Sequence, residues 1–278
     1  MNSITLRQGL QEGRRGGVWD YVSPSRLSRW LACPLAFSLQ YLDRLERAPT
    51  ASLFLGKMVH AGLELYYRQR QAGVRLTAQE VGWSLTETWG ERVAEEGISF
   101  ATLEAEEACK RQAIDLVAAY LAQVPADEPA PLAVEETFEA PLIDPQTGED
   151  LGLPLVGIVD LVLDAPEGPV LIDFKTAARG GAPPEIVHEL QLTAYAYLFR
   201  TVHGRVESGC EIRSLVKTRQ PAIERHRYPA RGDRHFGRLF AVLRGYLADL
   251  EARRFHFRPH LLCGGCDYRS GPCAEWAG

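Results

Sequence analysis

The sequence lacks three features that would place the chain in a membrane, outside the cell or among molecular motors. No apolar run approaches the roughly 20 residues that a helix needs to cross a bilayer. The N-terminus has no apolar stretch after its first charges, so it does not resemble a secretory signal peptide. No GxxxxGK(S/T) nucleotide-binding motif occurs. We therefore expect a cytoplasmic protein without a membrane partner and without a motor domain of its own.

The chain also lacks the overall positive charge that is typical of nucleic-acid-binding proteins, since its net charge is −5. The charges are unevenly spread. Residues 1–70 carry 10 Lys and Arg against 5 Asp and Glu, residues 71–199 carry 6 against 23, and residues 200–258 carry 14 against 6. Local basic patches decide where a phosphate backbone can bind. Charge alone is equally explained by solvated helix faces, and that is the simpler interpretation.

With 278 residues and 46% hydrophobic residues, the chain can bury a sizeable core. Periodicity and turn composition predict a flexible arm over residues 1–22 and a helical region over residues 23–124. A mixed α/β core should follow over residues 125–254, and a loop-like tail with three cysteines over residues 255–278.

Within the helical region, apolar spacing predicts a helix from Ser23 to about Leu45 and another over about 52–71. Thr77 and Glu80 fit a capping box that opens a third helix, and a fourth should cover about 101–124. In the core, strands are expected at 132–143, 152–163, 169–175, 207–217 and 222–229, with helices at 185–200 and 232–253.

Two carboxylates occur within apolar strands, where an unpaired charge is costly. Asp160 lies in LVGIVDLVL, and Asp173 lies in VLIDFK, which ends at Lys175. If the hairpin closes with Asp164 opposite Pro169, paired residue numbers sum to 333, and Asp160 faces Asp173. Opposed side chains share one face of a sheet, and so do residues two apart. The turn length therefore predicts that both aspartates and the lysine point to one side.

Opposed carboxylates repel one another, and a divalent cation with oxygen ligands relieves that repulsion. Such a metal can activate water and stabilise the charge on a phosphoryl group, while Lys175 orients the water or offsets negative charge. A structural alternative is a buried ion pair of Asp173 with Lys175, with Asp160 as a spectator. The hairpin alone does not decide between these two interpretations.

The hairpin and its neighbours together resemble the RecB-type branch of the PD-(D/E)XK nuclease superfamily. The shared elements, in order, are a Gly-to-His helix motif, GxxD, DxK and QxxxY. In this chain they are Gly56 to His60, Gly157 to Asp160, Asp173 to Lys175, and Gln191 to Tyr195. The start around Ser23 to Pro34 and the spacing of the tail cysteines also resemble this branch. Each motif is weak alone, but their common order makes the resemblance strong.

The resemblance implies a restriction-endonuclease-like mixed sheet flanked by helices. It also implies Mg²⁺ or Mn²⁺ bound by three side chains and one backbone carbonyl. The implied metal ligands are His60, Asp160, Asp173 and the carbonyl of Phe174. Lys175 would serve the attacking water, and Gln191 and Tyr195, which share a helix face, would position Lys175 or a DNA phosphate.

Three cysteines lie close together in the tail, at Cys263, Cys266 and Cys273, and a four-thiolate site needs one more ligand. Cys33, Cys109 and Cys210 are the candidates. The resemblance selects Cys33 and implies a 4Fe-4S cluster that ties the N-terminal helix to the tail. Thiol count alone fits zinc as well. Cys109 and Cys210 are then expected to be small buried hydrophobic residues.

The resulting prediction is a metal-dependent deoxyribonuclease, an exonuclease on single-stranded DNA or DNA ends, in recombination, repair or phage DNA processing. A helicase would be a separate partner protein. One alternative is a CRISPR spacer-acquisition nuclease with CRISPR integration partners, which shares all the motifs. Others are a non-catalytic iron–sulfur DNA-binding module and a zinc-stapled scaffold, although Asp160, Asp173, Lys175 and Gln191 are all intact.

Overall fold

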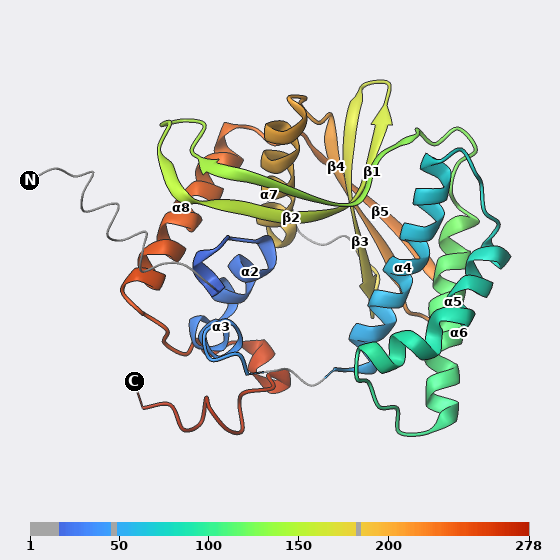
Figure 1. The fold of residues 1–278 in the computed structure, drawn as a ribbon, viewed down its shortest axis with the longest axis horizontal. Coiled ribbons are helices and arrows are strands. Elements are labelled where there is room, and N and C mark those ends of the chain that lie inside the picture. Colours follow the sequence, from blue (N-terminus) through green and yellow to red (C-terminus); the bar gives the residue numbers. More distant parts are fainter. Residues whose placement is uncertain (1–16, 46–48, 182–184, 278) are drawn as a thin grey trace, which may run out of the picture. The chain divides into compact units, whose positions relative to one another are not determined.

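The computed structural model of the chain describes residues 17–45, 49–181 and 185–277. The first part of the described chain is helical (Figure 1). Its helices are η1 (Gly17–Trp19), α2 (Pro24–Ala32), α3 (Pro34–Tyr41), α4 (Ala51–Gln71), α5 (Ala78–Glu95) and α6 (Leu103–Leu121). The second part mixes strands with helices. Its elements are β1 (Pro131–Ile143), β2 (Asp150–Ala165), β3 (Gly168–Ala177), α7 (Glu185–His203), β4 (Gly209–Val216), β5 (Ala222–Pro229), α8 (Asp233–Glu251) and η2 (Leu261–Gly265).

The expected change from helices to a mixed α/β core is therefore confirmed, and the capping box of α5 is formed by Thr77 and Glu80 as expected. One prediction was wrong. The single helix expected from Ser23 to about Leu45 is two helices, α2 and α3, separated at Cys33. Pro34 lacks a backbone N–H and disfavours helical geometry in the residue before it, and Cys33 is extended, with φ −160°.

The described end of the expected flexible arm is packed against the fold. Val18 and Val22 are buried, and Val22 forms a parallel bridge with Leu155 of β2. Two apolar side chains therefore anchor residues 17–22, although their sequence has no regular periodicity. Residues 1–16 of the expected arm lie outside the described residues.

The five strands form one mixed sheet in the order β1-β2-β3-β4-β5. β2 and β3 are antiparallel, β3 and β4 are parallel, and β4 and β5 are antiparallel. The parallel pair needs a crossover connection, which α7 supplies. The expected fold class, a mixed sheet flanked by helices, is confirmed.

The chain divides into two compact units. The first comprises residues 1–48, 138–157 and 232–278, and the second comprises residues 49–137 and 158–231. In the first unit, Trp30 of α2 and Phe37 of α3 both make edge-to-face ring contacts with Tyr246 of α8. These aromatic contacts form the centre of its core, since ring pairs of this kind bury large areas.

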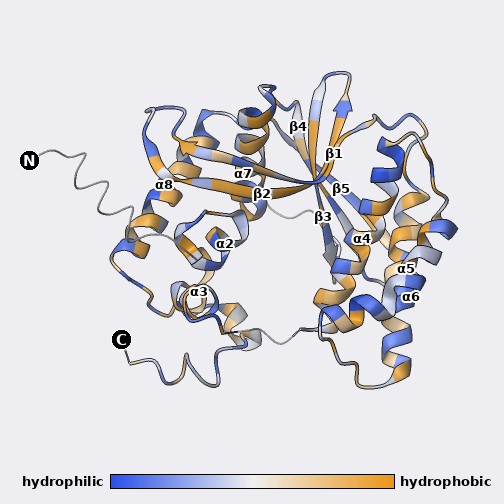
Figure 2. Cartoon of the chain, in the orientation of Figure 1, coloured by the Kyte–Doolittle hydropathy of each residue, from blue (hydrophilic) through white to orange (hydrophobic). Residues whose placement is uncertain are grey.

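In the second unit, α4, α5 and α6 pack beside one another and against the sheet (Figure 1). Figure 2 shows hydrophobic and hydrophilic residues interleaved along these helices, as amphipathic packing requires. The strand contribution to this core comes from β1, β2, β3 and β4. Phe174 of β3 lies against the rings of Tyr67 from α4 and Tyr120 from α6.

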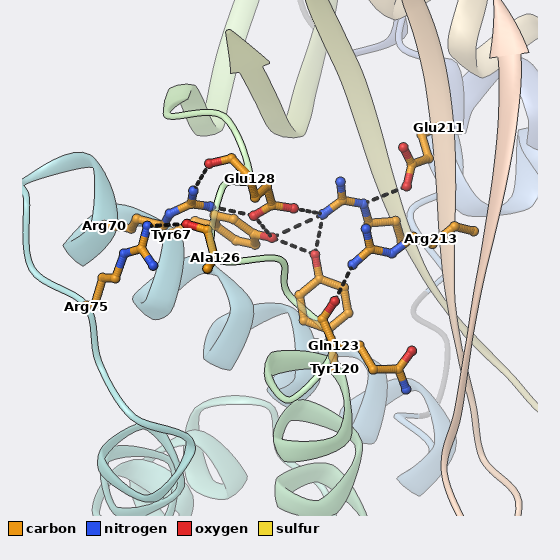
Figure 3. Close-up of polar contacts among 10 residues, drawn as sticks. Tyr67, Arg70, Arg75, Tyr120, Gln123, Ala126, Glu128, Glu211 and Arg213 are labelled. Carbon is orange, nitrogen blue, oxygen red and sulfur yellow. Dashed lines mark hydrogen bonds and ion pairs between the residues drawn. The ribbon is translucent and has the colours of Figure 1, made fainter. Parts of the chain in front are cut away.

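A buried polar network joins the same helices to β4 (Figure 3). Its centre is Arg213 of β4, which is 3% exposed. The Arg213 guanidinium lies 2.7 Å from a carboxylate oxygen of Glu128 and 2.9 Å from one of Glu211. It also donates hydrogen bonds to the hydroxyls of Tyr67 and Tyr120. One side chain of the sheet therefore contacts α4, α6 and the loop that precedes β1.

Glu128 has a second cation partner, because Arg70 of α4 pairs with its carboxylate and also donates to its backbone carbonyl. Tyr67 donates to the same carboxylate oxygen, Oε2, at 3.0 Å, whereas Arg213 contacts Oε1. Burial, the largest cause, raises the pKa values of the Tyr67 and Tyr120 hydroxyls, so both stay neutral donors. The charged groups of this network have opposite charges or hydroxyls as partners, and this pairing offsets the cost of burying them.

Within residues 17–45, 49–181 and 185–277, no helix has both the length and the apolar character needed to span a membrane.

Replacing Arg213 with Met should lower the free energy of unfolding by about 3–5 kcal/mol, because Glu128 and Glu211 would keep buried charges with weaker compensation. Urea denaturation measures the effect. Arg205→Met is the matched control. Arg205 pairs with Asp164 at 2.7 Å, but both side chains are nearly half exposed, so its loss should cost under about 1 kcal/mol. Equal losses in the two variants would contradict a stabilising role of the buried network.

Candidate active site

The register of the β2–β3 hairpin places the two aspartates directly after its last observed pair, Leu161 with Ile172. Leu161 pairs with Ile172, and Asp164 pairs with Pro169, which is the register that turn length predicts. Continued by one pair, it places Asp160 opposite Asp173. Both carboxylates are buried, with Asp173 only 1% exposed. The hairpin therefore holds two acidic side chains inside an apolar sheet.

Asp173 belongs to a chain of hydrogen bonds that ends on α7. The Nζ atom of Lys175 lies 2.9 and 2.7 Å from the two carboxylate oxygens of Asp173. Nζ also donates to Oε1 of Gln191 at 3.1 Å. The Gln191 amide donates in turn to Asp173 Oδ1 at 2.9 Å and to the Tyr195 hydroxyl at 2.8 Å. Hydrogen bonds thus link Asp173, Lys175 and Gln191 to one another and Gln191 to Tyr195, which lies on the same face of α7.

Asp160 occupies a different electrostatic environment. Burial and the neighbouring charge of Asp173 raise the pKa of its carboxyl to about 7, although the charge of His60 acts in the opposite direction. The backbone N–H of Phe174 donates to Asp160 Oδ2 at 2.7 Å. Phe174, whose carbonyl was an expected ligand, therefore adjoins the site. A cation bound here would favour the ionised form of Asp160.

His60 reaches this site from α4. A Cβ atom at Gly56, one turn earlier, would lie 3.1 Å from Thr176 Oγ1 of β3, so the glycine permits a close approach of helix and strand. Nδ1 of His60 then lies 3.8 Å from Asp160 Oδ2. Burial lowers the pKa of His60, but the carboxylates of Glu135, Asp160 and Asp173 together raise it above the ordinary value.

Glu135 of β1 is a member of the cluster that sequence reasoning missed. Its Oε1 lies 3.4 Å from His60 Nδ1. Its backbone is left-handed, with φ +42°, which is uncommon for a residue other than glycine. Regular alternation of buried and exposed residues also breaks here, because Ala133 and Val134 are both buried. That break was a readable signal, since two glutamates follow an apolar pair in the expected strand.

The donor atoms fit a hard divalent cation. One nitrogen or oxygen of each of His60, Glu135 and Asp160 lies within 4.8 Å of the others. Nearby, Oδ2 of Asp173 is buried and accepts no hydrogen bond of good geometry, although Lys175 lies beside it. Carboxylate oxygens with one imidazole are suitable ligands for Mg²⁺ or Mn²⁺.

At least six of the 14 basic residues in residues 200–258 form ion pairs within the fold. Among the arginines of this stretch, several pair with carboxylates of their own unit and so offer less charge to a phosphate backbone. They are Arg200 with Glu207, Arg205 with Asp164, Arg213 with Glu128, Arg231 with Glu185, Arg244 with Asp144, and Arg254 with Asp249. The number of basic residues in this stretch is therefore larger than the number of positive charges that are free to bind a phosphate backbone.

Four thiols gather in the first unit. Cys33, at the break between α2 and α3, and the tail residues Cys263, Cys266 and Cys273 line one cavity of about 240 Å³. Tyr268 of the tail is buried against α3, and its hydroxyl donates to the carbonyl of Leu45 at 2.9 Å. Cys109 and Cys210 lie in the other unit and are buried, as expected of small core residues.

Solved structures support the fold. A structure of a "Putative exonuclease" from Eubacterium rectale is 13% identical, covers 97% of this chain and 92% of its own, and has a TM-score of 0.58. At that identity the likeness shows the fold alone. The structure of the protein SSO0001 is 12% identical over 85% of this chain and 91% of its own, but its TM-score of 0.40 supports no conclusion. Among curated proteins, no sequence matches this chain.

The family comparison spans most of the chain. The model of the PD-(D/E)XK nuclease superfamily matches residues 21–271, a range that contains the hairpin, His60, and Gln191 with Tyr195. The mixed sheet has the architecture expected for that superfamily. The chain belongs to the PD-(D/E)XK nuclease superfamily.

Proposed function

We propose that this chain is a Mg²⁺- or Mn²⁺-dependent deoxyribonuclease of the RecB-type branch, acting as an exonuclease on single-stranded DNA or on DNA ends. One observation carries the proposal. Lys175, Asp173 and Gln191 are in mutual hydrogen-bond contact beside Asp160 and His60, within an otherwise apolar sheet. The structural alternative, an ion pair of Asp173 with Lys175 alone, does not explain why a buried Asp160 and His60 lie beside that pair.

We assign the metal to His60, Asp160, Asp173 and the carbonyl of Phe174. Bound there, a divalent cation supplies Lewis-acid stabilisation of a phosphoryl group and a more acidic water. Lys175 lies at the edge of this donor set and is about one-third exposed, so its ammonium can reach solvent. It orients the attacking water and offsets negative charge on the phosphate. The water oxygen bonds to phosphorus, the phosphodiester P–O bond breaks, and the leaving oxygen takes up a proton.

Gln191 and Tyr195 act on the lysine. The amide oxygen of Gln191 accepts from Lys175, and its amide nitrogen donates to Asp173, so the two side chains of β3 are fixed relative to each other. Tyr195 accepts from the same amide and fixes its orientation. This arrangement limits the rotamers of the long, flexible Lys175 side chain. A catalytic group that is held in place before the reaction raises the rate, because less entropy is lost in the transition state.

The exonuclease activity is our inference from the motifs and from the Eubacterium rectale protein, which is described as a "Putative exonuclease" and has a similar fold. We place the activity in recombination, repair or phage DNA processing, with any helicase as a separate partner. No observation on the described residues favours CRISPR spacer acquisition, and we propose no such role. The cytoplasmic location stays a prediction from the sequence.

We also propose that Cys33, Cys263, Cys266 and Cys273 hold a 4Fe-4S cluster with a structural role. One observation supports it. The four thiols line one cavity of about 240 Å³, which has room for several atoms. The choice of a cluster over a tetrahedral zinc site rests on the resemblance of the cysteine spacing to that of the RecB-type branch, because four thiolates suit either.

Lys175→Met should abolish metal-dependent cleavage while leaving DNA affinity within a few fold. The variant keeps most of the side-chain volume but removes the charge that serves the water, and catalytic groups of this kind contribute at least about a hundredfold. Affinity, in contrast, comes mainly from phosphate contacts elsewhere. Turnover of end-labelled single- and double-stranded DNA with Mn²⁺, and binding without metal, measure the two effects.

Lys110→Met is the control for that experiment, because Lys110 pairs with Glu107 on α6. It should cleave as the unaltered protein does, and Asp173→Asn should be as inactive as Lys175→Met. Near-normal cleavage by Lys175→Met would overturn the mechanism. Absence of nuclease activity in the unaltered protein, with DNA binding intact, would instead favour the non-catalytic module.

Protein purified without air should be brown and contain about four irons per chain. Cys33→Ala should lose the colour and melt at a lower temperature, because a thiolate site forms only in the folded chain and so stabilises it. Iron analysis and thermal denaturation measure both effects. Cys109→Ala, outside this unit, should keep the iron and lose only what a small cavity costs. Colourless protein with one zinc per chain would contradict the cluster.

A further inference from the structure

We propose that Glu135 is a direct ligand of the divalent cation, in one site with His60 and Asp160. The inference rests on the proposed metal dependence and adds a residue from β1 to a ligand set that the sequence motifs draw from α4, β2 and β3. Its basis is the grouping of one donor atom from each of the three residues within 4.8 Å.

Glu135 could bind the metal itself or could only orient His60. The ring nitrogen of His60 that faces Glu135 distinguishes these two roles. A carboxylate that only orients a metal-bound histidine contacts the nitrogen that does not bind the metal. Here Nδ1 lies 3.4 Å from Glu135 Oε1 and 3.8 Å from Asp160 Oδ2. The same nitrogen faces both carboxylates, so both lie on the side of the ring where the cation would bind.

The separations suit six-coordinate geometry. Bonds of about 2.0–2.1 Å to Mg²⁺ place adjacent donors about 3.0 Å apart and opposite donors about 4.2 Å apart. The separations of 3.4 and 3.8 Å from His60 fall between these limits. Since the donors of Glu135 and Asp160 also lie within 4.8 Å of each other, small side-chain rotations would bring all three onto one ion.

The backbone and a neighbouring arginine aim Glu135 at this point. Its left-handed φ interrupts the alternation of β1, and the Nη2 atom of Arg68 donates to its carbonyl at 3.4 Å. Among the described residues, His60 is the only side chain that hydrogen bonds its carboxylate. A third carboxylate beside Asp160 and Asp173 is unfavourable without a cation, because like charges repel.

Glu135→Gln should bind Mn²⁺ more weakly, by about tenfold or more, since the amide offers a neutral donor where the carboxylate offered a charged one to a hard cation. Mn²⁺ titration of the full chain without DNA, followed by the electron paramagnetic resonance signal of free Mn²⁺, measures the affinity. Glu136→Gln is the matched control, because Glu136 is the exposed next residue. It should bind as the unaltered protein does. Glu135→Asp, which keeps the charge but is shorter, should lie between them.

Melting temperatures test whether Glu135 instead has only a structural role. Without metal, Glu135→Gln should melt no lower than the unaltered protein, because the change removes one of three repelling charges. The rise in melting temperature with Mn²⁺ should shrink. Normal Mn²⁺ affinity in Glu135→Gln would overturn the inference but leave the proposed function standing. Absence of Mn²⁺ binding by the unaltered protein would overturn both.

Discussion

Arg213 is the constraint on which the geometry of the second unit depends. It is a buried cation on β4 that pairs with Glu211 of its own strand, and its remaining donors are satisfied by Glu128 and by the hydroxyls of Tyr67 and Tyr120. An unpaired guanidinium at that depth would be costly, so arrangements that leave it alone are strongly disfavoured. The network therefore fixes α4 and α6 against the sheet with a specificity that apolar contacts do not provide alone.

His60 inherits its position from this constraint. It lies on α4 about two turns before Tyr67. The one glycine between them, Gly62, is closely packed against Val117 and Leu85, so the two residues belong to one continuous helix. Phe174, which lies between Asp173 and Lys175 in β3, stacks against Tyr67 and so holds the same helix against this strand. A histidine remote in sequence from the hairpin thus comes within 4 Å of Asp160, at 3.8 Å.

The carboxylates of the site repel one another, and a bound cation would reduce that repulsion. Burial and the charge of Asp173 hold the pKa of Asp160 near 7, and Glu135 adds a further negative charge. A fold selected for stability alone would gain by replacing one of these acids with an apolar residue. Lys175 compensates Asp173 only, because its ammonium lies against that carboxylate. The metal that we propose, with Asp173 among its ligands, would compensate Asp160 and Glu135 as well.

Much of the hairpin could be predicted from the sequence. Its register follows from the turn between Asp164 and Pro169, and a period of two then places Asp173 and Lys175 on one face. The motif helix α7 likewise brings Gln191 and Tyr195 together through local i, i+4 geometry. These features depend on interactions between residues close in sequence, which a pattern of residue types records directly.

Other features were decided only by tertiary structure. Net charge did not reveal that many arginines of residues 200–258 pair internally, because pairing depends on partners as distant as Asp144 for Arg244. The apolar pair before Glu135 marked an irregular strand, but only the left-handed backbone of the folded chain turned this residue toward His60. The break at Cys33 was readable from Pro34, but its place beside the tail thiols required the packing of Tyr268. The sequence by itself determined local geometry and the kinds of side chain available, whereas long-range packing decided which of them meet, because contacts between distant segments leave no periodic trace in the chain.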